Sequence, residues 1–422
     1  MNPSVVDQVR AHDYVDITGY REIEEVLRRG RDFVFGDGKA ESADLLGGTI
    51  VTLDGPDHLQ RRRVLAKMID VRQPWGPEGA LFDEAFARNL GELRAREAAA
   101  DGLVRFDLMD FARKVFWQTL AAMIGFDSVD KPELVELLQS LVLPIVNAAS
   151  VEFSKLDHDQ IAAAGRAAMD QVRVTFFDPA VDRRIRQVLE ADGDAAKLGA
   201  LPGDLITSMV IAAGGTPDRG LVLRDALAVF AAAVNNPVNQ TAYQLEDLEA
   251  WLAEHPGDRE LLHSDAFFDR AAQETVRLHR TGNPYLVRQA LHDADLQTTG
   301  RHIERGQWIA LWIGQGNLDQ SVFGDDAAAF NPHRRVDQRG VKPYGLGFGA
   351  GPHVCLGRPL LIWGQGDEAA ALGLQARMLK ALVHAGVRVD PGGAREMAAH
   401  AAERYVRFDV FLGESLSPPA GP

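Results

Sequence analysis

The chain has 422 residues, a formal net charge of −15 and a calculated isoelectric point near 5.3. Because an acidic surface repels polyanions, nucleic acid is not an expected partner. Apolar residues make up 46% of the chain and charged residues 25%, which is the composition of a folded globular protein and not of a disordered or collagen-like chain.

Helical periodicity dominates the sequence. It covers Gly19–Gly30, Asp57–Ile69, Leu81–Ala100, Phe106–Ile124, Pro132–Ala149, Asp157–Phe176, Ala180–Ala191, Leu221–Ala253, Asp265–His279 and Glu368–His384. Strand-like patterns are short and few, and they cover Tyr14–Ile17, Ile50–Leu53, Tyr285–Arg288, Trp308–Ile313 and Tyr405–Phe411. Together these patterns predict a mainly α fold with a small β part.

No linker, fixed-period repeat or low-complexity block divides the chain. We therefore expect a single domain over residues 1–412 and a flexible, turn-rich tail over 413–422. The polar segment Met1–Asp13 is unlike a signal segment, and the chain has no run of about 18 apolar residues. The expected location is the cytoplasm, without a membrane partner.

Cys355 is the only cysteine, which excludes an intramolecular disulfide and any zinc site that needs several thiolates. A lone cysteine is most often a small buried side chain. Here, however, four alternate glycines precede it in the segment Tyr344–Pro359. Glycines let the backbone approach a flat ligand, and the amides that follow the cysteine can donate to its sulfur. We expect a helix beginning after Cys355 to lower the pKa of the thiol.

The segment Phe348–Gly357, FGAGPHVCLG, resembles the cysteine loop of the cytochrome P-450 family. The resemblance implies a cytochrome P-450-like fold, haem b (iron protoporphyrin IX) as cofactor, and Cys355 as the axial iron ligand between Phe348 and Gly357. A dinucleotide-binding loop is the competing interpretation, because Gly345, Gly347 and Ala350 have its spacing. No convincing strand leads into this loop, and no βαβ alternation surrounds it.

Two further elements support the resemblance. Glu274 and Arg277 lie at i and i+3 and are similar to the family's E-x-x-R helix, while Arg334 is similar to the arginine that completes a buried charge network. His58, Arg62, Arg288 and His353 match positions that bind the haem propionates in the family. Taken singly, each of these cations could be an ordinary solvated side chain.

The distal helix departs from the family pattern. The stretch where the family carries an acid-alcohol pair has Asn239 and Gln240 near those positions, with Thr241 beside them. These three residues are the candidate catalytic residues. Amides can order water but cannot act as general acids at neutral pH, and Pro237 has no amide hydrogen and is expected to kink the helix.

The resemblance implies a monooxygenase that inserts oxygen from dioxygen into a small, mostly apolar organic substrate, with a role in secondary metabolism. Electrons are expected from a separate ferredoxin and its reductase. The basic residues Arg61–Arg63 and Arg358 form a candidate docking patch, or simply a solvated face.

By their positions, Phe230, Val234, Tyr285 and Leu286 are expected to line the substrate pocket, although each could be ordinary core. Because no charges cluster at these four positions, a neutral or weakly polar substrate is the default expectation.

Two alternatives stay open. The first is an atypical haem-thiolate enzyme that performs peroxide-driven oxidation, dehydration, rearrangement or coupling. The second is a non-catalytic haem-binding or recruitment protein that keeps Cys355 and lacks the proton relay. Gly364 and Gly366 also interrupt the helix that usually follows the cysteine, which puts the surface for the redox partner in doubt.

Overall fold

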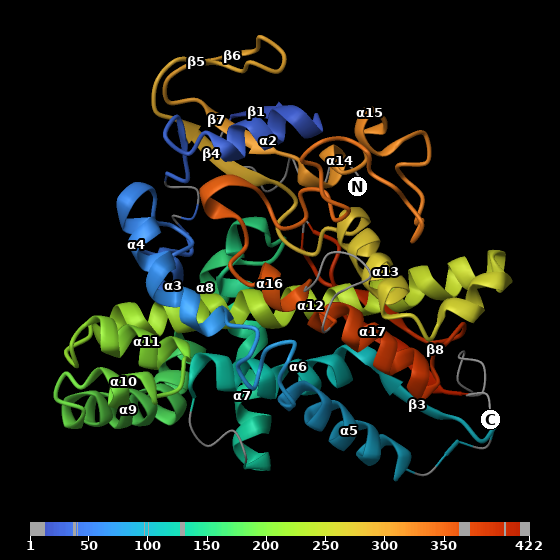
Figure 1. Cartoon of the computed structure of the whole chain (residues 1–422), viewed down its shortest axis with the longest axis horizontal. Helices are drawn as coiled ribbons and strands as arrows, with labels where there is room; N and C mark the ends of the chain where they lie inside the picture. The colour runs from blue at the N-terminus through green and yellow to red at the C-terminus, as the bar shows by residue number, and fades with distance from the viewer. Residues whose placement is uncertain are drawn as a thin grey trace.

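The structure is a computed structural model, and it describes residues 13–36, 39, 41–96, 98–99, 101–126, 131–362, 372–400 and 402–413. Helices form most of it, and strands β1, β4 and β7 lie together at one side of the helical body (Figure 1). The predicted mainly α fold with a small β part is confirmed. Most of the predicted tail, residues 414–422, lies outside the described residues.

The α-helices follow the predicted order with shifts at their ends. They are α2 (Tyr20–Arg28), α3 (Ala43–Leu46), α4 (Gly55–Leu65), α5 (Leu81–Arg94), α6 (Leu108–Ile124), α7 (Pro132–Ala148), α8 (His158–Val172), α9 (Asp178–Glu190), α10 (Ala195–Gly199), α11 (Leu205–Ala212), α12 (Arg219–Glu254), α13 (Asp265–Leu278), α14 (Ile313–Gly316), α15 (Gln320–Phe323), α16 (Arg358–Leu361) and α17 (Leu374–Ala385). A π-helical turn, Arg173–Phe177, joins α8 to α9.

The strands form three small sheets. They are β1 (Tyr14–Ile17), β2 (Phe33–Val34), β3 (Val104–Asp107), β4 (Leu286–Ala290), β5 (Ala294–Asp295), β6 (His302–Ile303), β7 (Trp308–Leu311), β8 (Val387–Val389), β9 (Arg395–Met397) and β10 (Tyr405–Leu412). One sheet has the order β1-β7-β4-β2, a second has β3-β10-β8 with β9 paired to β10, and β5 pairs with β6.

One predicted strand and one predicted helix start are wrong. Ile50–Leu53 is a turn and not a strand, because the hydroxyls of Thr49 and Thr52 both donate to the Leu46 carbonyl and close the chain locally. The helix predicted from Phe106 begins at Leu108, because Phe106 pairs with β10. Asp107 then caps α6, since its carboxylate accepts from the Met109 amide at 2.9 Å.

The long helix α12 runs through the middle of the helical body (Figure 1). By length and composition it could cross a membrane, but 61% of its apolar stretch is buried inside the protein, as expected of a core helix. Asp225, fully buried on α12, accepts from the Ile50 amide at 3.0 Å and pairs with Arg61 of α4. This carboxylate ties the distal helix to the helix that carries His58 and Arg62.

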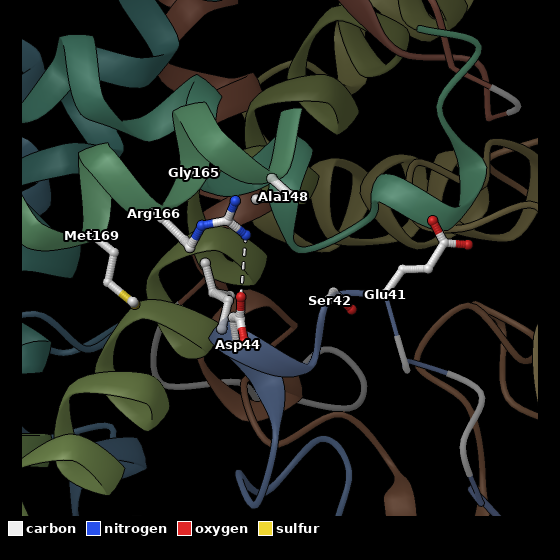
Figure 2. A pocket seen from close by; sticks show the side chains of 9 residues that line it. Glu41, Ser42, Asp44, Ala148, Gly165, Arg166 and Met169 are labelled. Atoms are coloured by element: carbon white, nitrogen blue, oxygen red, sulfur yellow. Dashed lines mark hydrogen bonds and ion pairs between the residues drawn. The ribbon is translucent and has the colours of Figure 1, made fainter. Parts of the chain in front are cut away.

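A small pocket lies where α3 meets α7 and α8 (Figure 2). Arg166 of α8 and Asp44 of α3 close it with an ion pair of 3.2 Å. Its volume is about 20 Å³, which holds about one water molecule. The pocket is therefore too small to be a substrate site.

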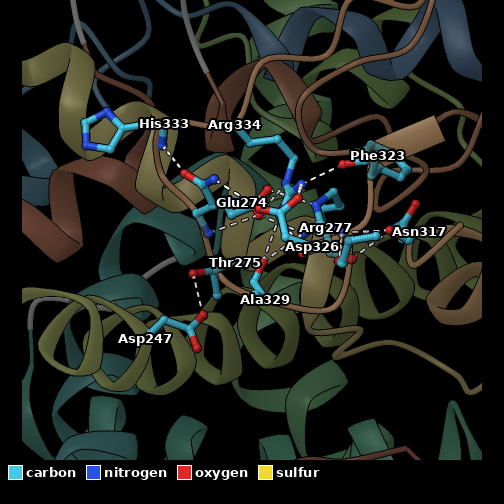
Figure 3. A network of polar contacts seen from close by, with 12 residues as sticks. Asp247, Glu274, Thr275, Arg277, Asn317, Phe323, Asp326, Ala329, His333 and Arg334 are labelled. Atoms are coloured by element: carbon cyan, nitrogen blue, oxygen red, sulfur yellow. Dashed lines mark hydrogen bonds and ion pairs between the residues drawn. The ribbon is translucent and has the colours of Figure 1, made fainter. Parts of the chain in front are cut away.

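A buried charge network links α13 to the segment before the cysteine loop (Figure 3). Glu274 accepts two hydrogen bonds from Arg277, at 2.7 and 2.8 Å, and one from Arg334 at 2.9 Å. Arg277 is fully buried and also donates to the carbonyls of Asn317 and Ala327. The Asn317 side chain in turn accepts from the Leu346 amide at 2.8 Å, so the network reaches the start of the cysteine loop.

The first prediction concerns this network. Glu274→Gln would leave the fully buried Arg277 without a carboxylate and Arg334 with Asp326 alone, and we expect the free energy of unfolding to fall by about 3–5 kcal/mol. Urea denaturation measures this change. Asp110→Asn is the matched control, because it removes a carboxylate from the exposed Asp110–Lys114 pair and should cost less than about 1 kcal/mol. Equal effects of the two variants would contradict the prediction.

Candidate active site

The cysteine loop is closed by its own backbone. The Cys355 amide donates to the Phe348 carbonyl at 2.8 Å, and the Val354 amide donates to the Gly351 carbonyl at 3.2 Å. Gly351 has φ +67°, and a Cβ there would collide with the Leu27 carbonyl of α2. Glycine is therefore required where this loop crosses α2. The Phe348 ring packs edge-on against Tyr344.

The side chain of Cys355 is exposed, yet the surrounding protein raises the pKa of its thiol by desolvation. The amides of Gly357 and Arg358 and the charge of Arg62 act in the opposite direction but do not outweigh desolvation. The expected lowering of the thiol pKa is thus wrong, because desolvation of Cys355 outweighs the hydrogen bonds from the Gly357 and Arg358 amides.

The predicted propionate-binding residues come together from three distant parts of the chain. The rings of His58 and His353 stack with their centroids 4.0 Å apart, and the His353 Nε2 lies 3.0 Å from an Asp54 oxygen. Burial, followed by the charges of His353 and Arg62, lowers the pKa of His58 to about 4. The buried Nδ1 of His58 has no hydrogen-bond partner in the described part of the structure.

Arg288 is a buried cation and Arg62 a half-buried one, and neither has a carboxylate partner among the described residues. Arg288 is 4% exposed and donates to the Val287 carbonyl, and desolvation lowers the pKa of each guanidinium group. Such groups gain stability from a bound anion. The residues present therefore fit haem b: Cys355 would hold the iron, and Arg62, Arg288 and His58 would hold the propionates.

Sequence reasoning missed Asp54, which orders this cluster. Its carboxylate accepts from the Phe35 amide at 2.8 Å as well as contacting His353. These contacts and the nearby charge of Arg288 lower the pKa of Asp54 against the effect of desolvation. The available signal was its place immediately before α4, where an aspartate commonly begins a helix.

The proposed docking patch is incomplete. Arg61 points inward to the buried carboxylate of Asp225 and is not available to a partner protein. Arg358 donates to the Tyr344 hydroxyl at 3.3 Å, and Arg63 is exposed. The inward ion pair explains why a run of basic residues does not form one basic face.

The three candidate relay side chains are already engaged. The Thr241 hydroxyl donates to the Pro237 carbonyl at 2.9 Å, and the Gln240 amide donates to the His279 carbonyl at 2.5 Å. Asn239 donates to the Asn235 carbonyl and accepts from the Tyr405 amide at 2.7 Å. All three are buried, and α12 continues through Pro237.

The predicted substrate residues have different surroundings. Phe230 lies in the core with its ring centroid 4.6 Å from that of Trp117, and Tyr285 packs against Phe153 at 5.3 Å. Leu286 is half-buried at the start of β4. Val234 lines a cavity of about 230 Å³ between α6, α7, α12 and the turn after β9. Phe230 therefore fits the alternative that it is an ordinary core residue, whereas Val234 borders a cavity.

A family model of the cytochrome P-450 matches residues 265–362, from the start of α13 through the cysteine loop and α16. The chain is 25% identical to the steroid C26-monooxygenase of Mycolicibacterium smegmatis, over 82% of this chain and 73% of that protein. It is 23% identical to the mycinamicin IV hydroxylase/epoxidase of Micromonospora griseorubida, over 82% of this chain and 77% of that protein. The chain belongs to the cytochrome P-450 family.

Solved structures show the same cytochrome P-450 fold. The Bacillus megaterium protein CYP109E1 in complex with corticosterone has a TM-score of 0.67 at 16% identity, covering 97% of this chain and 98% of that one. A cytochrome P-450 in complex with an acyl carrier protein ligated to hexadec-9Z-enoic acid has a TM-score of 0.69 at 17% identity, covering 98% and 99%. The predicted fold, haem b as cofactor and the assignment as a monooxygenase are confirmed.

The second prediction tests the propionate contacts. Arg288→Gln should increase the rate of haem loss by about ten- to a hundredfold, because hydrogen bonds to charged groups contribute about 1.5–3 kcal/mol. Transfer of haem to excess apomyoglobin, followed by absorbance, measures the rate. The control is Arg305→Gln, which changes an exposed arginine. An unchanged rate in Arg288→Gln would show that this side chain does not hold the cofactor.

Proposed function

We propose that this cytochrome P-450 inserts one oxygen atom from dioxygen into a small, mostly apolar organic substrate. The observation that carries the proposal is the exposed Cys355, the single cysteine, together with the cations Arg62 and Arg288, which have no carboxylate partner among the described residues. When bound, haem b would supply reductive activation of dioxygen. Of the chain's own residues, Cys355 would hold the iron, and Arg62, Arg288 and His58 would hold the propionates.

A separate ferredoxin with its reductase is the proposed electron donor, and the cytoplasm is the proposed location. The loss of Arg61 from the candidate patch leaves Arg63 and Arg358 as the basic residues that could meet an acidic partner. The named activities of the two relatives, on a steroid and on mycinamicin, support a mostly apolar substrate and a place in secondary metabolism.

A second candidate function is peroxide-driven oxidation. It is favoured by the bonds of Thr241 and Asn239 to backbone groups, because neither side chain is free to pass a proton without rearranging. Peroxide already carries the electrons and protons that dioxygen must acquire, so this reaction does not need the same relay. A non-catalytic haem-binding role has no specific observation in its favour.

The third prediction tests the ligand. The reduced, carbon-monoxide-bound protein should show the red-shifted band of a thiolate-ligated haem, and Cys355→Ala should lose it because no other cysteine can replace the ligand. Absorbance spectra of the two proteins measure this. Absence of haem from the wild-type protein, or a band that survives in the variant, would refute the proposed function.

The fourth prediction separates the two oxidants, with styrene as a small apolar probe. If Thr241 relays protons, Thr241→Ala should reduce styrene oxide formation with dioxygen and a ferredoxin system to about a tenth or less. Product formation with hydrogen peroxide should stay within about twofold. Wild-type turnover with peroxide but none with dioxygen and the ferredoxin system would instead favour the second candidate function.

A further inference from the structure

Fully buried cations in this protein usually have a carboxylate partner. Among the described residues, Lys39 pairs with Glu152 at 2.9 Å, Arg184 with Asp204 at 3.0 Å and Arg277 with Glu274 at 2.7 Å. Two other fully buried arginines among the described residues, Arg288 and Arg404, have no carboxylate partner. The haem propionates account for Arg288, but nothing described so far accounts for Arg404.

Arg404 contacts neutral groups only. Its guanidinium group donates to the Thr281 carbonyl at 3.0 Å, to the Ser150 hydroxyl at 3.4 Å and to the Asn283 side chain at 3.5 Å. A second cation, Arg280, donates to the carbonyl of the same Asn283. The two guanidinium groups are thus joined through one residue, without a carboxylate between them.

Both cations are held in an unfavourable electrostatic state. Desolvation lowers the pKa of Arg404 to about 10, and desolvation followed by the charge of Arg404 lowers the pKa of Arg280 to about 10. Removing one of two mutually repelling buried charges, or binding an anion beside them, would relieve this state.

Arg404 lines the cavity of about 230 Å³ that Val234 also lines. The cavity has cationic side chains at Arg113 and Arg404, whereas desolvation lowers the pKa of His400 to about 2 and leaves that ring neutral. Among the described residues, no aspartate or glutamate contributes to the lining. Amide side chains and apolar side chains complete it, namely Asn147, Asn235, Asn239, Met109, Val142, Leu143, Val146 and Val238. The lining therefore combines positive charge with an apolar wall, which suits an amphipathic anion.

We propose that this cavity binds a carboxylic acid with an apolar body, and that Arg404 holds its carboxylate, with the charge of Arg280 beside Arg404 adding to the attraction. The apolar body would lie along Val234 and Val238 of α12. The inference rests on the proposed function in one respect, because it identifies such an acid as the substrate class of the monooxygenase. It revises the expectation of a neutral substrate, which followed from four positions that do not include either arginine.

The test compares octanoate with 1-octanol, which has the same chain without the charge, by isothermal titration calorimetry on the haem-containing protein. Octanoate should bind at least about tenfold more tightly, since hydrogen bonds to charged groups are the stronger ones. Arg280→Gln and Arg404→Gln should each reduce this preference to about twofold or less. Arg407→Gln is the matched control, because Arg407 is an exposed arginine of β10 that pairs with Asp409, and it should leave the preference unchanged.

Equal binding of the two probes by the wild-type protein would overturn the proposal, as would a preference that persists in both arginine variants. Arg280→Gln keeps the test decisive if Arg404→Gln does not fold, because Arg280 makes fewer hydrogen bonds than Arg404. The carbon monoxide spectrum of the same preparation separates the two hypotheses. A missing thiolate band with an intact octanoate preference would refute the proposed function while supporting the anion site.

Discussion

The free-energy cost of burying a charge without a partner is the constraint on which the rest of this structure depends. Glu274 lies between Arg277 and Arg334, and because neither arginine can lose that carboxylate without a large penalty, α13 and the segment before the cysteine loop are held together. The loop that presents Cys355 is anchored to this network through Asn317. Where a buried cation lacks such a partner, the same cost indicates a place for a ligand.

Two groups of unpaired cations meet this description, and they differ in their surroundings. Arg62 and Arg288 share their electrostatic environment with Cys355 and Asp54, as expected for side chains that receive the cofactor. Arg404 and Arg280 meet at Asn283, and Arg404 borders a cavity against α12. Arg62 and Arg288 suit the propionates of haem b. Arg404 and Arg280 suit an anion that comes from outside the protein.

The state of the thiol depends on the cofactor. Desolvation raises the pKa of Cys355 in the ligand-free protein, although the Gly357 and Arg358 amides already donate to its sulfur. Cys355 would hold the iron as a thiolate, and these amides would then stabilise its negative charge. The loop is thus shaped for the bound state. On the distal helix, by contrast, Thr241 and Asn239 are hydrogen-bonded to backbone groups and would have to rearrange to move a proton.

The sequence by itself determined the helical fold and the members of the Glu274 network, and it predicts Cys355 as the iron ligand, because local periodicity and a continuous motif around a single cysteine require no tertiary information. Residues 1–12 and the interrupted segment near Gly364 lie outside the described residues, so those expectations stay predictions. Only the tertiary structure decided which cations are paired. Arg61 pairs with Asp225, which lies 164 positions further along the chain. Arg280 and Arg404 are also distant in the sequence, yet they lie close enough for the charge of Arg404 to lower the pKa of Arg280. Charge pairing between distant segments depends on how helices pack, and no local pattern records it.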